Sequence, residues 1–297
     1  MTDKPNAPFG YVATAMITPF APSGEVDHEA AWRLARHLSD TGTDTLVVAG
    51  TTGESPTLSD EEKVALFHTV VQAVAEKDTM VVAGTGTYDT AHSVELTHRA
   101  VDAGVDGILA VNPYYNKPPQ RGLVAHFNAI AAVGSPVMVY NIPSRTSARV
   151  EVETLAELSG NPGIVAVKDA VGSSDFTSQT IAAAPNLAIY SGDDSVTLPM
   201  MSVGAVGVVS VIAHLAGRAV RDMVRSAHDG DWEEARRLHH LLLPLCQACF
   251  LEPNPMPLKA AMNAFWGQVG SVRLPLVEAL PETLIAIEKA LGAVHPL

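Results

Sequence analysis

Lys168 is the residue whose type and position most clearly suggest chemistry. It ends a short apolar run, residues 164–168, which is typical of a buried β-strand. Burial disfavours the charged form of an amine, and a neutral amine can attack a carbonyl compound to form a Schiff base. The alternative is a structural lysine paired with a carboxylate such as Asp169. The sequence therefore predicts either a nucleophilic lysine or a buried ion pair at this strand end.

Side chains suited to proton transfer and carboxylate binding follow other predicted strands. Tyr140 ends the run 136–140 at the same depth as Lys168, and neighbouring parallel strands lie about 4.8 Å apart, so its phenol could exchange protons with an adduct on the lysine. Arg145 carries the planar guanidinium that suits a carboxylate. A space-filling tyrosine and a solvated arginine are the simpler alternatives.

A glycine-rich stretch, GTTGES (50–55), follows another predicted strand. Its glycines allow close approach of the backbone, and its amides and hydroxyls could hold a carboxylate. Glu54 could satisfy backbone donors within the loop, and an ordinary strand-to-helix turn is the alternative. Polar stretches also follow two further strands, NPYYNKP (112–118) and SGDD (191–194).

These residues need a fold that gathers the ends of several strands. Predicted strands cover residues 12–17, 45–49, 80–83, 107–111, 136–140, 164–168, 187–191 and 206–211. Predicted helices cover residues 27–41, 59–76, 90–103, 120–133, 151–159, 173–183, 194–203 and 217–228. Such a series of strand–helix units favours a (β/α)8 TIM barrel of the α/β class, in which chemistry occurs at the carboxyl ends of the strands. An open doubly wound sheet is the alternative, supported by GTG (84–86), although Asp89 replaces the third glycine of that motif.

Three more helices are predicted after the barrel, at 232–250, 256–266 and 281–291. We therefore expect residues 1–230 to form the barrel and residues 231–297 to form a C-terminal helical region.

Composition excludes several classes of partner. The 297-residue chain has 19 basic and 32 acidic residues and a net charge of -13, which argues against nucleic acid and anionic membranes. Cys246 and Cys249 lie in an apolar helical stretch, which favours two core thiols over a redox pair and fits a reducing cytoplasm. The histidines show no metal-ligand spacing, so no metal site is expected.

Three motifs, GTTGES (50–55), YNIPSRT (140–146) and VKDA (167–170), occur in the order and context of a known family. The chain resembles the dihydrodipicolinate synthase family, within the pyruvate-dependent N-acetylneuraminate lyase superfamily of class I aldolases. The resemblance runs from MITPF (16–20) to EPNP (252–255). It implies a lyase of diaminopimelate and lysine biosynthesis that condenses pyruvate with L-aspartate 4-semialdehyde to 4-hydroxy-tetrahydrodipicolinate. It also implies no cofactor beyond the covalent Schiff base of pyruvate with Lys168.

The resemblance implies roles in the chemistry for matching residues. Lys168 would form the Schiff base, and the resulting enamine would attack the aldehyde. Tyr140 would carry protons to and from the adduct, and Thr51 would link Tyr140 to Tyr115. Tyr115 would reach the site of a neighbouring subunit, in a homotetramer built as a dimer of dimers.

The resemblance also implies roles in binding. Thr51 and Thr52 would hold the pyruvate carboxylate, Arg145 would bind the carboxylate of the semialdehyde, and Gly192 and Val209 would offer backbone carbonyls near the adduct. Sister enzymes that act on 2-keto sugar acids generally lack the arginine and the second threonine, so this set favours the synthase. A catalytically silent homologue is a third possibility, against which the complete residue set speaks.

One departure from the family pattern concerns feedback inhibition. Relatives inhibited by L-lysine use an asparagine, a glutamate and a histidine at positions that read Tyr88, His92 and Lys63 here. The missing glutamate and the added positive charge predict that L-lysine inhibits this protein weakly or not at all.

Overall fold

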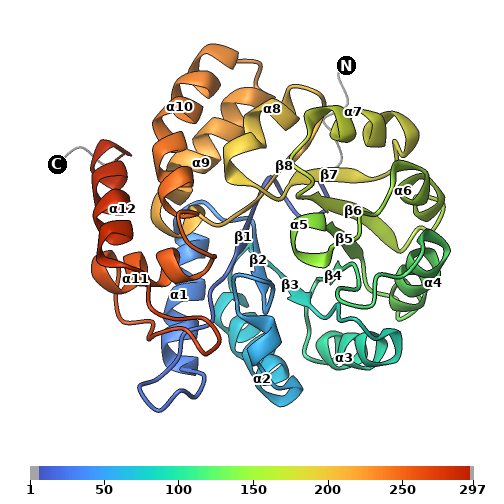
Figure 1. Ribbon diagram of the computed structural model, residues 1–297, viewed down its shortest axis with the longest axis horizontal. Coiled ribbons are helices and arrows are strands. Elements are labelled where there is room, and N and C mark those ends of the chain that lie inside the picture. The colour runs from blue at the N-terminus through green and yellow to red at the C-terminus, as the bar shows by residue number, and fades with distance from the viewer. Residues whose placement is uncertain (1–6, 295–297) are drawn as a thin grey trace.

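The computed structural model describes residues 7–294, which form a closed parallel β-barrel surrounded by helices (Figure 1). Each strand pairs with the next along the chain, and β8 pairs with β1 to close the barrel. The strands are β1 (Val12–Ala15), β2 (Thr45–Val48), β3 (Met80–Gly84), β4 (Gly107–Val111), β5 (Val137–Asn141), β6 (Ile164–Asp169), β7 (Ala188–Ser191) and β8 (Gly207–Ser210). The TIM-barrel prediction is confirmed, and the open doubly wound alternative is wrong.

Helices connect the strands and continue beyond the barrel. Those of the barrel are α1 (His28–Asp40), α2 (Asp60–Val74), α3 (Thr90–Asp102), α4 (Gln120–Ala131), α5 (Pro143–Thr146), α6 (Val152–Leu158), α7 (Ser174–Ala183), α8 (Thr197–Met201) and α9 (Ala213–His228), with 3-10 turns η1 (Ser55–Thr57) and η2 (Asp194–Val196). The C-terminal helices are α10 (Trp232–Ala248), α11 (Met256–Phe265) and α12 (Pro281–Val294).

The strands read as continuous apolar runs because both of their faces are buried. Side chains pointing inward, such as Met138 and Tyr190, form one apolar cluster inside the barrel. Side chains pointing outward join helix residues such as Leu34 and Phe127 in a larger cluster between the barrel and its helices. This two-sided burial is what a parallel sheet covered by helices requires.

Two predicted helices differ from those observed. Residues 194–203 form η2 followed by the short α8, because Asp194 turns inward and accepts hydrogen bonds from Ser210 Oγ at 2.5 Å and Val211 N at 2.8 Å. The eighth helix starts earlier than predicted, at Ala213, and is kinked at Ala216, where φ is -138°. Residues 143–146, which belong to none of the predicted helices, form the helix α5.

The C-terminal helices lie together on one side of the barrel (Figure 1). There α10 packs against α9 and α12, and α11 packs against α12. Cys246 and Cys249 are buried free thiols in and after α10, as predicted for core cysteines. Within residues 7–294, no helix combines the length and apolarity needed to cross a membrane.

Candidate active site

Lys168 lies near the carboxyl end of β6, and its side chain points into the barrel. It is two residues after Ala166, which belongs to the inner cluster, so strand alternation turns its side chain inward. The register places Lys168 beside Tyr140 of β5 on one side and Tyr190 of β7 on the other. The lysine is only 5% exposed, and its Nζ lies 4.0 Å from the centroid of the Tyr140 ring. The predicted adjacency of Lys168 and Tyr140 is therefore confirmed.

Asp169 is not the partner of Lys168. One of its carboxylate oxygens accepts a hydrogen bond from Val171 N at 2.9 Å, and the other accepts one from Thr177 Oγ1 at 2.7 Å. Burial raises the pKa of Asp169, although these two hydrogen bonds oppose that shift. The carboxylate ties β6 to the start of α7, so the alternative of a Lys168–Asp169 ion pair is wrong.

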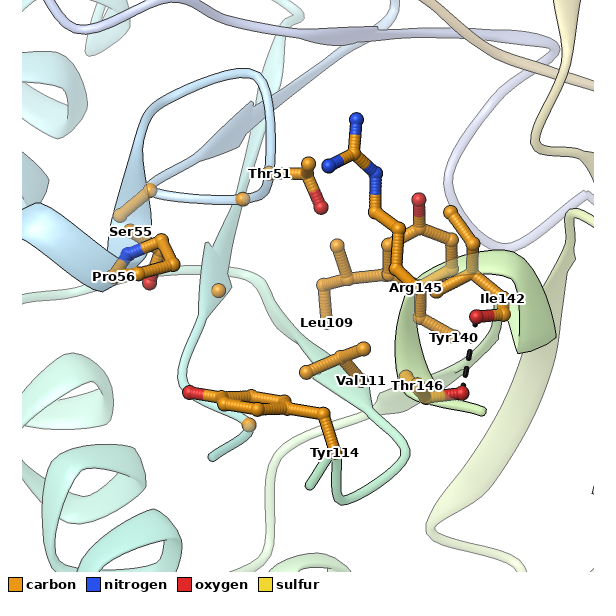
Figure 2. A pocket seen from close by; sticks show the side chains of 14 residues that line it. Thr51, Ser55, Pro56, Leu109, Val111, Tyr114, Tyr140, Ile142, Arg145 and Thr146 are labelled. Carbon is orange, nitrogen blue, oxygen red and sulfur yellow. Dashed lines mark hydrogen bonds between the residues drawn. The ribbon is translucent and has the colours of Figure 1, made fainter. Parts of the chain in front are cut away.

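A cavity of about 210 Å³ opens at the carboxyl ends of β2 to β5. Thr51, Tyr140 and Arg145 all line it, from three different segments of the chain (Figure 2). Apolar walls come from residues such as Leu109 and Val111. The cavity thus combines a phenol, a hydroxyl and a guanidinium within an apolar lining, which suits a small carboxylate-bearing ligand.

Arg145 owes its position to α5. The backbone N–H of Arg145 and the hydroxyl of Thr146 each donate to Ile142 O at 3.0 Å, and Ser147 ends the helix in the left-handed conformation. This single turn directs the arginine toward the cavity directly after β5.

The GTTGES loop is tightly folded at the end of β2. Glu54 N donates to Thr51 O at 3.1 Å, and Ser55 N donates to Gly50 O at 3.2 Å. Thr51 lines the cavity, whereas Thr52 is buried and its Oγ1 accepts a hydrogen bond from Asn254 Nδ2 at 2.9 Å. The cavity therefore meets the first threonine directly and not the second.

The GTG stretch has a structural explanation in the same region. A Cβ at Gly84 would lie 2.3 Å from Ala49 O, so only glycine allows β3 to end this close to the GTTGES loop. Gly84 and Gly86 also line the cavity. These glycines shape the barrel mouth and do not form a dinucleotide-binding loop.

The remaining predicted site residues do not line this cavity, and Lys168 itself lies behind Tyr140 rather than in the lining. Tyr115 is 93% exposed and has a positive φ of 71°, while its neighbour Tyr114 lines the cavity. Gly192 follows β7, and its N–H donates to Asp169 O at 2.7 Å. Val209 is buried in β8 within the inner cluster.

Two features of the site and its surroundings were missed from the sequence. Tyr190 is buried beside the lysine, and its hydroxyl accepts from Phe9 N at 3.1 Å and donates to Gly10 O at 2.9 Å. Glu54 was expected to serve its own loop, but it pairs with Lys259 of α11 at 2.7 Å. The signals were present, as a tyrosine in the seventh predicted strand and a lysine within the apolar helix MPLKAAM.

The closed barrel and the cavity at the carboxyl ends of its strands define a (β/α)8-barrel protein with an enzyme-like site. The model of the dihydrodipicolinate synthetase family matches residues 8–294, and the chain belongs to this family.

Individual relatives agree with the family match. The chain is 50% identical over 283 residues to 4-hydroxy-tetrahydrodipicolinate synthase of Heliobacterium modesticaldum, covering 95% of this chain and 94% of the relative. Among solved structures, it is similar to the lysine-bound enzyme of Cyanidioschyzon merolae, with TM-score 0.96, 43% identity and coverage of 98% and 100% of the two chains. It is also similar to the chloride-inhibited dihydrodipicolinate synthase of Acinetobacter baumannii complexed with pyruvate, with TM-score 0.93, 34% identity and coverage of 97% and 100%.

Proposed function

We propose that this protein is a 4-hydroxy-tetrahydrodipicolinate synthase, a lyase that condenses pyruvate with L-aspartate 4-semialdehyde in the synthesis of diaminopimelate and lysine. The observation that carries the proposal is the inward-facing Lys168 beside Tyr140, at the mouth of a barrel whose relatives bear that name. The reaction needs no cofactor, because the lysine itself activates pyruvate.

The chemistry begins at the Lys168 amine. The amine attacks the C2 carbonyl of pyruvate, water leaves, and an iminium forms. Its electron withdrawal acidifies the methyl group, so loss of a proton gives an enamine that attacks the aldehyde of the second substrate. The amine of that substrate then displaces Lys168 as the ring closes. Tyr140, in contact with the lysine and open to the cavity, moves the protons of these steps.

The cavity walls supply the binding groups. Thr51 and Thr52 hold the pyruvate carboxylate through the GTTGES loop, and Arg145 binds the carboxylate of the semialdehyde as a charge-assisted pair. Gly192 and Val209 offer their backbone carbonyls to the adduct from the opposite side of the barrel. An arginine on the cavity wall supports this acceptor over the alternative, a 2-keto sugar acid.

Borohydride trapping tests the Schiff base. Pyruvate with sodium borohydride is expected to add to the peptide carrying Lys168 a mass equal to pyruvate, minus one water, plus two hydrogens. Lys168→Ala should abolish the addition, and Lys117→Ala, at an exposed lysine, should retain it. An unmodified wild-type protein would contradict the proposal. Trapping with pyruvate but condensation only with sugar-derived aldehydes would favour the sister activity.

We also propose a homotetramer in which Tyr115 completes the site of a partner subunit. An aromatic side chain that is 93% exposed with a strained backbone supports a role in contact with another chain. Mixing inactive Lys168→Ala and Tyr115→Phe proteins should restore part of the activity, because hybrid pairs contain one intact site. Sedimentation of the wild type tests the assembly directly, and a monomer that is fully active would contradict it.

We place the enzyme in the cytoplasm. The support is that Cys246 and Cys249 are buried as free thiols, and burial raises the pKa of Cys249 to about 12, which keeps that thiol unreactive.

A further inference from the structure

A buried ion pair joins the C-terminal helices to the GTTGES loop. Lys259 Nζ of α11 lies 2.7 Å from Glu54 Oε1, and the two side chains are 2% and 0% exposed. The second carboxylate oxygen of Glu54 accepts from Arg273 N at 2.9 Å, and Lys259 Nζ donates to Ser271 O at 2.9 Å. The charge that holds the loop therefore comes from the region after the barrel.

A second tie reaches the same loop from the same side. Asn254 Nδ2 donates to Thr52 Oγ1 at 2.9 Å, and both residues are buried. Because the hydroxyl oxygen of Thr52 accepts this bond, the hydroxyl hydrogen is left to be donated elsewhere. Asn254 thus fixes the side chain next to Thr51, the threonine that lines the cavity.

The loop needs support from outside its own residues. Ala49 and Glu54 both have positive φ, of 54° and 56°, which residues with a Cβ adopt only when their surroundings enforce it. Gly84 packs against Ala49 and Gly50 of this turn and has no side chain to contribute a polar contact. The hydrogen bond from Asn254 and the ion pair with Lys259 therefore act on a strained loop backbone that needs outside support.

Overall stability is a poor explanation for the pair. A buried ion pair can often be replaced by apolar side chains without loss of stability, since desolvation offsets the attraction between the charges. Burial lowers the pKa of Lys259 to about 8, although the neighbouring Glu54 carboxylate opposes that shift. What the charges provide that apolar side chains do not is a fixed direction for Glu54, and with it for the loop.

We propose that Lys259 and Asn254 are positioning residues, which hold the GTTGES loop so that Thr51 presents its hydroxyl to the carboxylate of the keto acid. The identity of this ligand rests on the proposed function, whereas the holding of the loop does not.

Hydrogen–deuterium exchange of the ligand-free protein tests the holding of the loop. Amides of residues 50–55 should exchange at least about tenfold faster in Lys259→Met and in Asn254→Ala, as expected when buried polar ties are lost. The matched control is Arg237→Met, which removes an exposed cation of α10 that pairs with Glu234. Its loop exchange should equal that of the wild type. Unchanged exchange in the first two variants would overturn the proposal.

Borohydride trapping over a range of pyruvate concentrations tests the consequence for the ligand. The half-saturating pyruvate concentration should rise about tenfold in both positioning variants, because a misplaced loop weakens carboxylate binding. The maximal trapped fraction should stay near the wild-type value. In the condensation assay, the half-saturating semialdehyde concentration should also stay near the wild-type value. General destabilisation does not produce this difference between the two substrates. An unchanged half-saturating pyruvate concentration would overturn the assignment of Lys259 and Asn254 as positioning residues.

If Lys259→Met does not fold, the double variant Glu54→Gln with Lys259→Met removes both charges and should show the same defect. If pyruvate fails to trap the wild type, the proposed function fails, and the exchange measurement still decides whether the loop is held.

Discussion

Two tyrosines, Tyr140 and Tyr190, flank Lys168 at the same level of the barrel. We expect removal of one hydroxyl to lower turnover and removal of the other to lower stability. Tyr140 lines the cavity, and within residues 7–294 its hydroxyl has no hydrogen-bond partner. The Tyr190 hydroxyl is buried and bonded to Phe9 N and Gly10 O. Phenylalanine at either position keeps the ring and removes only the oxygen, so the pair separates catalysis from stability.

The structure sets the expected magnitudes. Tyr140→Phe removes the proton carrier beside Lys168, and general acid–base catalysis is worth about 10²–10⁴ in rate, or about 3–5 kcal/mol of the activation barrier. It breaks no hydrogen bond of the folded chain, so the free energy of unfolding should change by less than about 0.5 kcal/mol. Tyr190→Phe leaves a buried N–H and a partly buried carbonyl without this partner, which should lower the free energy of unfolding by about 2 kcal/mol. Its turnover should stay near that of the wild type.

The assay couples formation of the condensation product to a reductase, with urea unfolding of each variant in parallel. Borohydride trapping at saturating pyruvate is the additional readout, because Tyr140→Phe should still allow a slow adduct at Lys168. Tyr140→Phe with more than about one tenth of wild-type turnover would refute the role of the phenol, since general acid–base catalysis contributes far more. Equal loss of turnover in Tyr190→Phe, in a folded protein, would show that packing around Lys168 and not proton transfer is what matters.

Further predictions concern binding, pH and inhibition. Arg145→Ala should raise the KM for the semialdehyde about ten- to a hundredfold through loss of a charge-assisted pair, while pyruvate trapping stays unchanged; a raised KM for pyruvate alone would contradict this. Burial raises the pKa of Asp194 to about 6 from an unfolded value of 3.8. The free energy of unfolding should therefore fall as pH rises from about 4 to about 6, and above that range the loss should amount to about 3 kcal/mol. Asp194→Asn, measured by urea unfolding at several pH values, should therefore gain stability over the wild type above pH 6 and lose that advantage below pH 4; a pH-independent difference would contradict it. Sub-millimolar L-lysine should leave turnover unchanged in a coupled assay. Where inhibited relatives carry a glutamate and a histidine, this chain has His92 and Lys63, and the Asp60 carboxylate already pairs with His92 Nε2 at 2.6 Å and with Lys63 Nζ at 3.6 Å. Half-inhibition in that concentration range would refute this.

The barrel was predictable because its determinants are local. Apolar runs buried on both faces, separated by capped amphipathic helices, specify strand–helix units without knowledge of distant contacts. The capping box of Ser59 and Glu62 at the start of α2 is one such determinant. The split of residues 194–203 was not predictable in this way, because the inward turn of Asp194 depends on Ser210 and the N–H groups that follow β8.

The site was predictable as far as strand alternation and strand ends could reach. The pairing of Lys168 with Tyr140 follows from two strand ends at equal depth. The position of Arg145 on the cavity wall required α5, whose single turn is too short to leave a periodic pattern. The contact of Asn254 with Thr52 joins residues 202 positions apart, and the pairing of Glu54 with Lys259 is similarly distant. Contacts of this kind depend on how α11 docks, which no local pattern encodes.

Burial alone does not identify the reactive lysine. Lys63, Lys168 and Lys259 are all buried, and Lys259 is the most buried of the three. The difference lies in their partners. Lys63 pairs with Asp60 and Lys259 pairs with Glu54, whereas Lys168 Nζ lies over the ring of Tyr140. A carboxylate neighbour stabilises the ammonium form and opposes nucleophilic attack, whereas the ring beside Lys168 Nζ belongs to Tyr140, which carries no carboxylate and lines the cavity. Lys168, predicted to be reactive from its place at a strand end, is thus the buried lysine without a carboxylate partner within residues 7–294.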